Sequence, residues 1–189
     1  MIIKVRKKNR LELAKMFAAL KFKTGAEIGV RAGEYTELLC QTIPTLEKIY
    51  AVDPWDVVAE DTTSAVYGKS AQEHYYRKTV RRLSKYPQVE IVRKLSHEAV
   101  RDIPFNSLDF VYIDGAHTFD YVMLDLIEWT KRVKPGGIVS GDDYYIMRRG
   151  NVMGAVNAYC EAHNPESLNI FRPAFGDPYP VAQWWFKKL

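Results

Sequence analysis

The pattern of apolar and polar positions predicts strands that alternate with helices along most of the chain. Short apolar runs, each followed by glycine or a polar residue, recur at intervals that leave room for a helix between them. These runs cover residues 26–30, 48–55, 89–94, 108–113 and 137–140. Such alternation is typical of an α/β fold with a largely parallel sheet.

Apolar residues at helical spacing predict the intervening helices. Asn9 and Glu12 resemble a capping pair at the start of one helix, and Thr118 is placed to cap another that ends at the Pro-Gly-Gly sequence 135–137. Their apolar stripes are Leu13, Phe17 and Leu20 in the first, and Phe119, Val122, Leu126, Trp129 and Val133 in the second. A further helix is expected over 155–162. These helices would cover the sheet on both faces.

The last part of the chain predicts a hairpin. Residues 169–175 and 181–187 alternate in polarity and are joined by a turn at Gly176-Asp177-Pro178. The hairpin would add one antiparallel strand to an otherwise parallel sheet, with Tyr179 and the Trp184-Trp185 pair packed on that edge.

The segment 57–86 departs from the pattern. Residues 57–70 are polar and small, and 71–86 read as a basic helix with Tyr76, Val80 and Leu83 on one side. A long irregular segment at the ligand-binding edge of an α/β sheet is often a lid or an acceptor-binding element. We therefore expect residues 57–86 to set the choice of substrate.

Composition places the chain in one domain covering residues 1–189. A chain of 189 residues with 47% hydrophobic residues can bury one good core. No apolar run is long enough for a signal peptide or a membrane span, and Cys40 and Cys160 lack the spacing of a disulfide framework or a zinc site, so a reducing cytoplasm fits best. The net charge of +4 is concentrated near residues 4–10 and 69–85. Such runs mark either solvated helix faces or a surface for a polyanion.

The stretch Ala26 to Thr36 carries the clearest chemical signal. Glu27 leads into Gly29 and Gly33, and residues without a Cβ allow a tight turn and the close approach of a ligand to the backbone. A GxGxxG dinucleotide fingerprint is absent, because Arg31 stands two residues after Gly29 and no third glycine follows Gly33 at the required distance. The stretch therefore predicts a nucleotide cofactor with a positive centre and an amino group rather than a pyrophosphate.

Residues after the next two strands extend this cofactor site. Asp53 stands roughly 20 residues beyond the glycine turn, where a carboxylate can accept hydrogen bonds from both ribose hydroxyls, although it is also a typical turn residue before Pro54. Trp55 would flank the adenine or belong to the core. Ser96, followed by His97, would meet the adenine or cap the helix that begins at Glu98.

Three aspartates at the ends of two strands predict a metal site. Asp114 follows the strand 108–113, and Asp142 and Asp143 follow the strand 137–140, so adjacent strands would bring three carboxylates to one rim beside the glycine turn. Clustered anions repel one another unless a positive charge lies among them, and Mg²⁺, Mn²⁺ or Ca²⁺ prefers such oxygen ligands. The alternatives are a turn and capping role for Asp142-Asp143 and a purely cofactor-orienting role for Asp114.

A metal there suggests a mechanism. A cation that coordinates a substrate hydroxyl lowers its pKa and fixes its oxygen for attack on a methyl group. His117 would take the departing proton or act as a further ligand, or would simply pack near Thr118.

From about Gly25 to Tyr145 the chain resembles the class I S-adenosylmethionine-dependent methyltransferases. The motifs are EIGVRAGEYT, VDPW, YIDGAHTFDYVMLDL and KPGGIVSGDDY, in that order, and they are most similar to the small metal-dependent O-methyltransferases that include macrolide-sugar and rhamnosyl enzymes. The resemblance implies a Rossmann-like three-layer αβα sandwich with a seven-stranded sheet and a reversed terminal hairpin.

The resemblance also implies roles for individual residues. It implies S-adenosylmethionine as the cofactor, with a small-molecule or sugar hydroxyl as the acceptor. It implies that Glu27, Gly29, Gly33, Asp53 and Ser96 bind the cofactor and that Asp114, Asp142 and Asp143 bind the metal. Arg31 replaces a glycine common in the class. Ala116 replaces an acidic residue proposed as the base in several sugar-modifying members, which makes His117 the leading candidate for the base.

Other functions remain as alternatives at this stage. The basic segments suit a methyltransferase that acts on nucleic acid, but the base-methylating tetrapeptide of Asn or Asp, Pro, Pro and an aromatic is absent, and IDGAH stands in its place. A non-catalytic cofactor-binding subunit would have no use for three juxtaposed carboxylates. A nicotinamide-dependent dehydrogenase is disfavoured by the glycine pattern. No membrane partner is expected, and a homo-oligomer is left open because the Tyr and Trp side chains can face a partner or the core.

Overall fold

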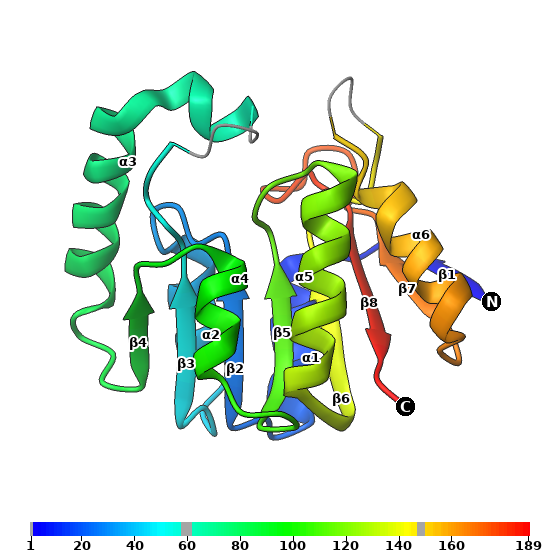
Figure 1. The fold of residues 1–189 in the computed structure, drawn as a ribbon. Coiled ribbons are helices and arrows are strands. Elements are labelled where there is room, and N and C mark those ends of the chain that lie inside the picture. The colour runs from blue at the N-terminus through cyan, green and yellow to red at the C-terminus, as the bar shows by residue number, and fades with distance from the viewer. Residues whose placement is uncertain (1, 58–61, 147–149) are drawn as a thin grey trace.

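The computed structural model describes residues 2–57, 62–146 and 150–189 and has one mixed sheet covered by helices on both faces (Figure 1). The strand order is β1-β7-β8-β6-β5-β2-β3-β4. The strands are β1 Ile3–Arg6, β2 Thr24–Ile28, β3 Lys48–Val52, β4 Val89–Val92, β5 Leu108–Ile113, β6 Val133–Gly141, β7 Leu168–Phe171 and β8 Gln183–Lys187. All neighbouring pairs are parallel except those of β8, which runs antiparallel to β6 and β7. The predicted α/β fold and its reversed terminal hairpin are confirmed.

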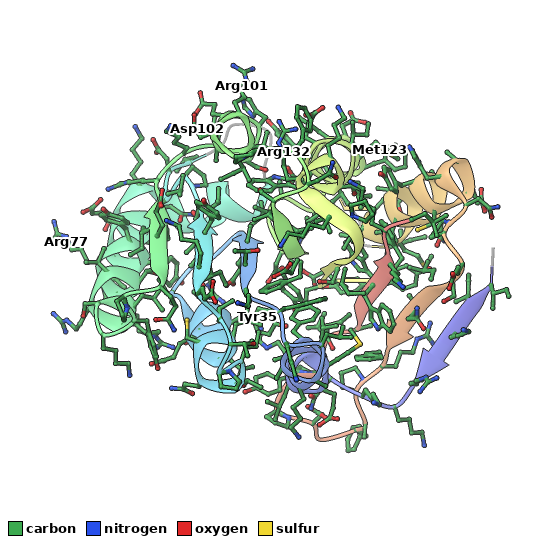
Figure 2. All side chains as sticks on the ribbon, turned by 90° about the horizontal axis from the view of Figure 1, so that it is seen from below. Tyr35, Arg77, Arg101, Asp102, Met123 and Arg132 are labelled. Atoms are coloured by element: carbon green, nitrogen blue, oxygen red, sulfur yellow. The ribbon has the colours of Figure 1, made fainter. Side chains whose placement is uncertain are left out.

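Six α-helices and a short 3₁₀ helix accompany the sheet within the described residues. They are α1 Arg10–Ala19, α2 Glu34–Thr42, α3 Thr62–Leu83, α4 Ser96–Ala99, α5 Phe119–Arg132 and α6 Val152–His163, with the 3₁₀ helix at Val100–Asp102. Helices α4, α5 and α6 lie on one face and α1 and α2 on the other. Viewed from below, Tyr35 of α2 and Met123 of α5 lie on opposite sides of the sheet (Figure 2). None of the helices in the described ranges is long and apolar enough to span a membrane.

The alternation of side chains along β5 divides the core between the two faces. Phe110 and Tyr112 pack with residues of α1 and α2, whereas Val111 and Ile113 pack with α5 and α6. All four side chains are buried because β5 lies inside the sheet, between β2 and β6. A central strand buried on both faces is expected to be largely apolar, and Asp109 is the one charged residue of β5.

The structure has one more strand than the sequence predicted. Strand β1 pairs in parallel with β7 at the edge of the sheet and makes it eight-stranded rather than seven-stranded. The prediction missed β1 because its four residues, Ile3-Lys4-Val5-Arg6, are all exposed and carry two positive charges. Such a strand lacks the buried face that produces a recognisable pattern.

The predicted segment 57–86 is more helical than expected. Residues 58–61 lie outside the described part of the chain, and α3 begins at Thr62 rather than at residue 71 and ends at Leu83 rather than Tyr86. At Gly68 the backbone leaves the helical region, with φ 68° and ψ 168°. Glycine tolerates this conformation, so two helical pieces join across a kink there.

Other predicted boundaries also differ. The helix expected over 155–162 is α6 Val152–His163, and the hairpin strands expected over 169–175 and 181–187 are β7 Leu168–Phe171 and β8 Gln183–Lys187. Asn9 caps α1 by accepting hydrogen bonds from the amides of Leu11 and Glu12, but Glu12 pairs with Lys15 instead of reaching back, and Leu20 lies past the helix end. Strand β6 begins at Val133, before the Pro-Gly-Gly sequence that we expected to separate helix from strand.

Candidate functional site

A cavity of about 370 Å³ lies where the parallel strands end. It is lined by residues that follow β2, β3, β4, β5 and β6, among them Gly29, Asp53, Ser96, Asp114 and Asp143. These strands run in the same direction, so their carboxyl ends meet at the upper edge of the sheet in Figure 1. In open α/β sheets ligands bind in the crevice at this edge.

The glycine turn after β2 forms one wall of the cavity and depends on the absence of a side chain at Gly29. Its φ is +87°, and a Cβ built on it would lie 2.0 Å from the backbone oxygen of Asp114. Gly33 has φ +75° at the N-cap of α2, and no side chain caps this helix. Both predicted glycines therefore occupy backbone positions that an L-residue adopts only with strain.

Asp53 holds the turn in place. Its Oδ2 accepts hydrogen bonds from the backbone amides of Val30 and Arg31, both at 2.9 Å, and its Oδ1 accepts one from the amide of Trp55 at 2.7 Å. Asp53 also lines the cavity. The predicted contact with a ribose remains a prediction, and the structure adds a role in ordering the glycine turn.

The substitution Asp53→Ala should therefore affect both stability and ligand binding. Three backbone donors lose their acceptor, which we expect to cost about 2 kcal/mol or more of unfolding free energy and to weaken cofactor binding about tenfold. Denaturant unfolding and calorimetric titration with S-adenosylhomocysteine measure the two effects. Asp53→Asn, which keeps one acceptor oxygen, should lie between the wild type and Asp53→Ala. Unchanged affinity in Asp53→Ala would contradict the ribose contact, and unchanged stability would contradict the role in ordering the turn.

Glu27 lies beneath the turn rather than on the cavity surface. Its side chain is buried and accepts a hydrogen bond from the Thr36 hydroxyl. Burial raises the pKa of Glu27 to about 8, a shift that the bond from Thr36 opposes. The predicted cofactor contact of Glu27 stays a prediction, because the residue is not part of the cavity lining.

The raised pKa of Glu27 predicts a pH-dependent stability. The folded state holds the proton more tightly than the unfolded state, whose pKa is near 4.5, so this contribution is fully present below pH 4.5 and is lost as the pH rises through about 8. At about 1.4 kcal/mol per pKa unit, the ligand-free wild type should lose a few kcal/mol of unfolding free energy relative to Glu27→Gln across this window. Denaturant unfolding at a series of pH values measures the difference. If the difference in unfolding free energy between the wild type and Glu27→Gln did not change with pH, Glu27 would be ionised in the folded protein.

Trp55 belongs to the core. It is 1% exposed, its indole N–H donates to the backbone oxygen of Arg31 at 2.7 Å, and its ring packs 5.2 Å from that of Tyr76. It does not line the cavity, so of its two predicted roles the packing role is the one observed.

Ser96 does not cap a helix, contrary to one of its two predicted roles. It is the first residue of α4, which has Leu95 at the N-cap and begins two residues before Glu98. Its hydroxyl accepts a hydrogen bond from the Trp129 indole at 2.8 Å and donates one to Asp125. Ser96 and His97 both line the cavity, as the prediction of an adenine contact requires.

Two of the three predicted carboxylates converge on His117. The His117 Nε2 lies 2.8 Å from Asp143 Oδ2 and 3.6 Å from Asp114 Oδ1. These three side chains place one ligand atom each within 4.8 Å of one another, and they are the group within the described residues that could hold a metal ion. Two carboxylate oxygens and an imidazole nitrogen suit Mg²⁺, Mn²⁺ or a similar cation.

The charges of this group are strongly coupled. Burial and the neighbouring carboxylates raise the pKa of Asp114 to about 7, although the bond to His117 opposes this shift. Burial works against a charged His117, but hydrogen bonds to Asp114 and Asp143 outweigh it and raise the pKa of His117 to about 10. Burial likewise disfavours ionised Asp143, yet His117 holds the pKa of this carboxyl below its usual value. In the metal-free protein His117 thus supplies the positive charge that the clustered carboxylates need.

Asp142 stands apart from the group. It lines the same cavity, but its Oδ1 accepts hydrogen bonds from the Asp143 amide and the Gln183 side chain, both at 3.0 Å. Burial raises the pKa of Asp142. The structure therefore places His117, rather than Asp142, with Asp114 and Asp143, and the metal role of Asp142 stays a prediction.

The lining of the cavity is acidic overall. Its aspartates are Asp53, Asp56, Asp114, Asp125, Asp142 and Asp143, and its basic residues are Arg31, His97 and His117. Such a surface attracts cations and repels phosphate groups. Gln72 and Tyr75 of α3 also line it, and the acceptor-binding role of the segment 57–86 stays a prediction.

Asp125 also lines the cavity, although it was not among the residues predicted for the site. It is 6% exposed and lies on the buried face of α5, between Val122 and Trp129 in the helical repeat. A carboxylate at helical spacing within an apolar stripe is the signal that could have identified it, since an unpaired charge is rarely buried without a function.

Comparisons with known proteins agree on the class. A family model described as a methyltransferase domain matches residues 26–144. The uncharacterized protein y4gI of Sinorhizobium fredii is 26% identical over 165 residues, which cover 85% of this chain and only 16% of y4gI. The chain thus spans about a sixth of the length of that relative.

Solved structures share the fold. An rRNA methylase from Streptococcus thermophilus superposes with a TM-score of 0.66 at 15% identity, covering 96% of this chain and 98% of that one. A candidate O-methyltransferase from Klebsiella pneumoniae gives 0.63 at 12% identity, covering 95% and 80%. At such low identity these likenesses concern the fold alone.

Proposed function

Since the chain belongs to the methyltransferase domain family and is an S-adenosylmethionine-dependent methyltransferase, we propose that it transfers the methyl group to a hydroxyl of a small molecule or sugar with the help of a divalent metal ion. The single observation that carries this proposal is the group of Asp114, His117 and Asp143 beside the glycine turn. Asp114 joins the two parts, because its backbone oxygen faces Gly29 and its side chain belongs to the group.

The residues of the cavity fit the cofactor. The absence of a Cβ at Gly29 lets the turn lie directly against the backbone of Asp114 at the cavity wall, and Asp53 offers a carboxylate beside the turn. The acidic lining suits the positive sulfonium and amino groups of S-adenosylmethionine and gives it no phosphate site. Gly29, Gly33 and Asp53 would form the cradle, with Ser96 at the adenine end.

The residues also fit a divalent metal. Asp114 and Asp143 would hold the ion, either with the His117 Nε2 as the third ligand or with this nitrogen left free as the proton acceptor, and Asp142 borders the same space. When bound, the ion supplies Lewis acidity that lowers the pKa of an acceptor hydroxyl. The two carboxylates, which His117 holds together in the metal-free protein, would fix the ion and with it the acceptor oxygen.

His117 remains the leading candidate for the proton acceptor. Its Nε2 already faces the two carboxylates, and Ala116 at the neighbouring cavity position offers no acidic alternative. In the metal-free protein His117 is protonated at neutral pH, so a base role requires that another positive charge replace its own between the carboxylates. Metal binding and proton acceptance by His117 are therefore linked in this proposal.

The acidic cavity argues against nucleic acid as the acceptor. Several of the basic residues that suggested such a surface are engaged in ion pairs: Arg82 and Lys85 with Glu37, and Arg77 with Glu73. A phosphate backbone would have to approach a lining with twice as many aspartates as arginine and histidine residues together.

Methyl transfer to hydroxylated acceptors tests the proposal. Purified protein is incubated with S-adenosylmethionine and a panel of catechols and sugars, and S-adenosylhomocysteine is quantified. We expect turnover that a chelator removes and that added Mg²⁺ or Mn²⁺ restores. Methylation that is insensitive to chelator but falls steeply with salt, on RNA rather than on the panel, would contradict the proposal and favour a polyanionic acceptor.

A further inference from the structure

Asp125 is a buried carboxylate that the proposed chemistry does not use. It projects from α5 toward α4 and is only 6% exposed, yet it lines the cavity. None of the ion pairs among the described residues involves it. A carboxylate buried without a cation costs stability that an apolar residue at the same helix position would not, so its presence at the cavity wall points to a ligand.

The hydrogen bonds around Asp125 leave one of its oxygens facing the ligand space. The Trp129 indole can only donate, so the Ser96 oxygen accepts its hydrogen bond and the Ser96 hydroxyl hydrogen goes to Asp125 Oδ1. The other oxygen, Oδ2, lies 3.7 Å from the Cβ position at Gly115. Because Gly115 has no side chain and also lines the cavity, it leaves the approach to Oδ2 open.

The surrounding lining suits a flat ring with a polar edge. Val52, Pro54, Leu95, Ala116 and Tyr121 contribute apolar surface to the same cavity. Ser96 follows β4, at the outer side of β3, whereas Asp143 follows β6, on the far side of β5. Asp125, bound to Ser96 and next to Gly115, therefore borders the cavity between the ends of β4 and β5, whereas Asp143 lies on the β6 side.

We infer that Asp125 Oδ2 accepts a hydrogen bond from the exocyclic amino group of the adenine of S-adenosylmethionine and so makes the site selective for adenine over hypoxanthine. Of the parts of the cofactor, the adenine combines a flat apolar surface with an amino group at its edge, and the amino-acid and ribose parts have no such surface. Ser96 acts as a positioning residue, because its bond fixes which Asp125 oxygen is left for the ligand. The inference rests on the cofactor and not on the metal or the acceptor.

Burial of Asp125 supports the same pairing. It raises the pKa of this carboxyl to about 7, so the protonated form is also accessible near neutral pH. The ionised Oδ2 accepts from the amino group, and a protonated Oδ2 can donate to the ring nitrogen beside that group. Both protonation states thus complement the edge of adenine.

The test compares two ligands that differ only at this edge. S-Adenosylhomocysteine and S-inosylhomocysteine, which carries a carbonyl oxygen in place of the amino group, are titrated calorimetrically into the wild type, Asp125→Asn and Asp120→Asn. Asp120 is an exposed residue of the same helix and serves as the matched control. The wild type and Asp120→Asn should prefer S-adenosylhomocysteine by about 10- to 100-fold, as for a hydrogen bond to a charged group.

In Asp125→Asn the preference should fall to about one or reverse. Ser96 keeps the amide oxygen turned toward itself, so the amide NH₂ faces the ligand and donates to the carbonyl of S-inosylhomocysteine. Additional replacement Ser96→Ala frees the amide to turn over and should restore part of the preference for S-adenosylhomocysteine.

Several results would overturn the inference. Equal affinity of the wild type for the two ligands would do so without any variant, and hence even if Asp125→Asn failed to fold. An equal loss for both ligands in Asp125→Asn would assign Asp125 a structural role only. If the wild type bound neither ligand, S-adenosylmethionine would not be the cofactor and the inference would fall with it. If the ligands bound but activity did not depend on a metal, only the proposed function would be contradicted.

Discussion

Replacing Asp143 by glycine should lower the rate of methyl transfer by about two to three orders of magnitude, the loss seen when one electrostatic stabiliser is removed from an active site. Asp143 is the carboxylate that lies closest to His117, and the pKa of its carboxyl is held low, so it is ionised at neutral pH. Its φ of +58° makes glycine a suitable replacement, because the carboxylate is removed without adding backbone strain. Steady-state kinetics with an active acceptor measure the effect.

The affinity for S-adenosylhomocysteine should meanwhile stay within about threefold of the wild type. Asp120→Asn, which removes a charge from an exposed position nearby, is the control and should leave both rate and affinity unchanged. A parallel loss of cofactor affinity in Asp143→Gly would instead make Asp143 a cofactor ligand.

Replacing Gly29 by alanine should abolish cofactor binding and destabilise the protein. Two effects add: a φ of +87° that costs an L-residue about 1–2 kcal/mol, and a Cβ only 2.0 Å from the backbone oxygen of Asp114. The backbone of Asp114 cannot give way without moving the end of β5 and with it the Asp114 side chain. We expect loss of S-adenosylhomocysteine binding by about 100-fold or more, since small misplacements in a site cost this much.

Gly176 provides a matched control for Gly29. It has nearly the same φ, +81°, but a Cβ there would meet nothing within 4 Å. Gly176→Ala should therefore cost about 1 kcal/mol of unfolding free energy and leave the cofactor affinity unchanged. If Gly29→Ala behaved like Gly176→Ala in calorimetry and thermal unfolding, the close approach of the turn to Asp114 would have no part in binding.

Strands that are buried on both faces of the sheet could be predicted from the sequence, whereas the strand at the edge of the sheet could not. Strand β5 was predicted with its observed bounds because five of the six residues of Leu108–Ile113 are apolar or aromatic and only Asp109 interrupts the run. Strand β1 was missed because pairing with β7, and not burial, makes it a strand. The part of α3 before the kink at Gly68 was not predicted, because residues 57–70 are polar and small and show no apolar stripe.

The candidate site was predictable to the level of strand ends. Residues that follow β2, β5 and β6 were expected at one rim because parallel strands end together, and Gly29, Asp114 and Asp143 do line one cavity. Which side chains turn toward one another was not predictable. Asp142 and Asp143 are adjacent in sequence, yet Gln183 of β8 binds the first and His117 the second. The orientation of Asp125 depends on the Ser96 hydroxyl, which in turn accepts a hydrogen bond from Trp129. These contacts arise only when α4 packs on α5.

The measurement that tests the central claim most directly is the binding of Mn²⁺ to the protein loaded with S-adenosylhomocysteine, followed by electron paramagnetic resonance. We predict a single bound Mn²⁺ per chain in the wild type and in Asp120→Asn, and loss of this signal in Asp143→Gly. Absence of bound Mn²⁺ in the wild type, or binding that Asp143→Gly leaves unchanged, would contradict a metal site formed by Asp114, His117 and Asp143.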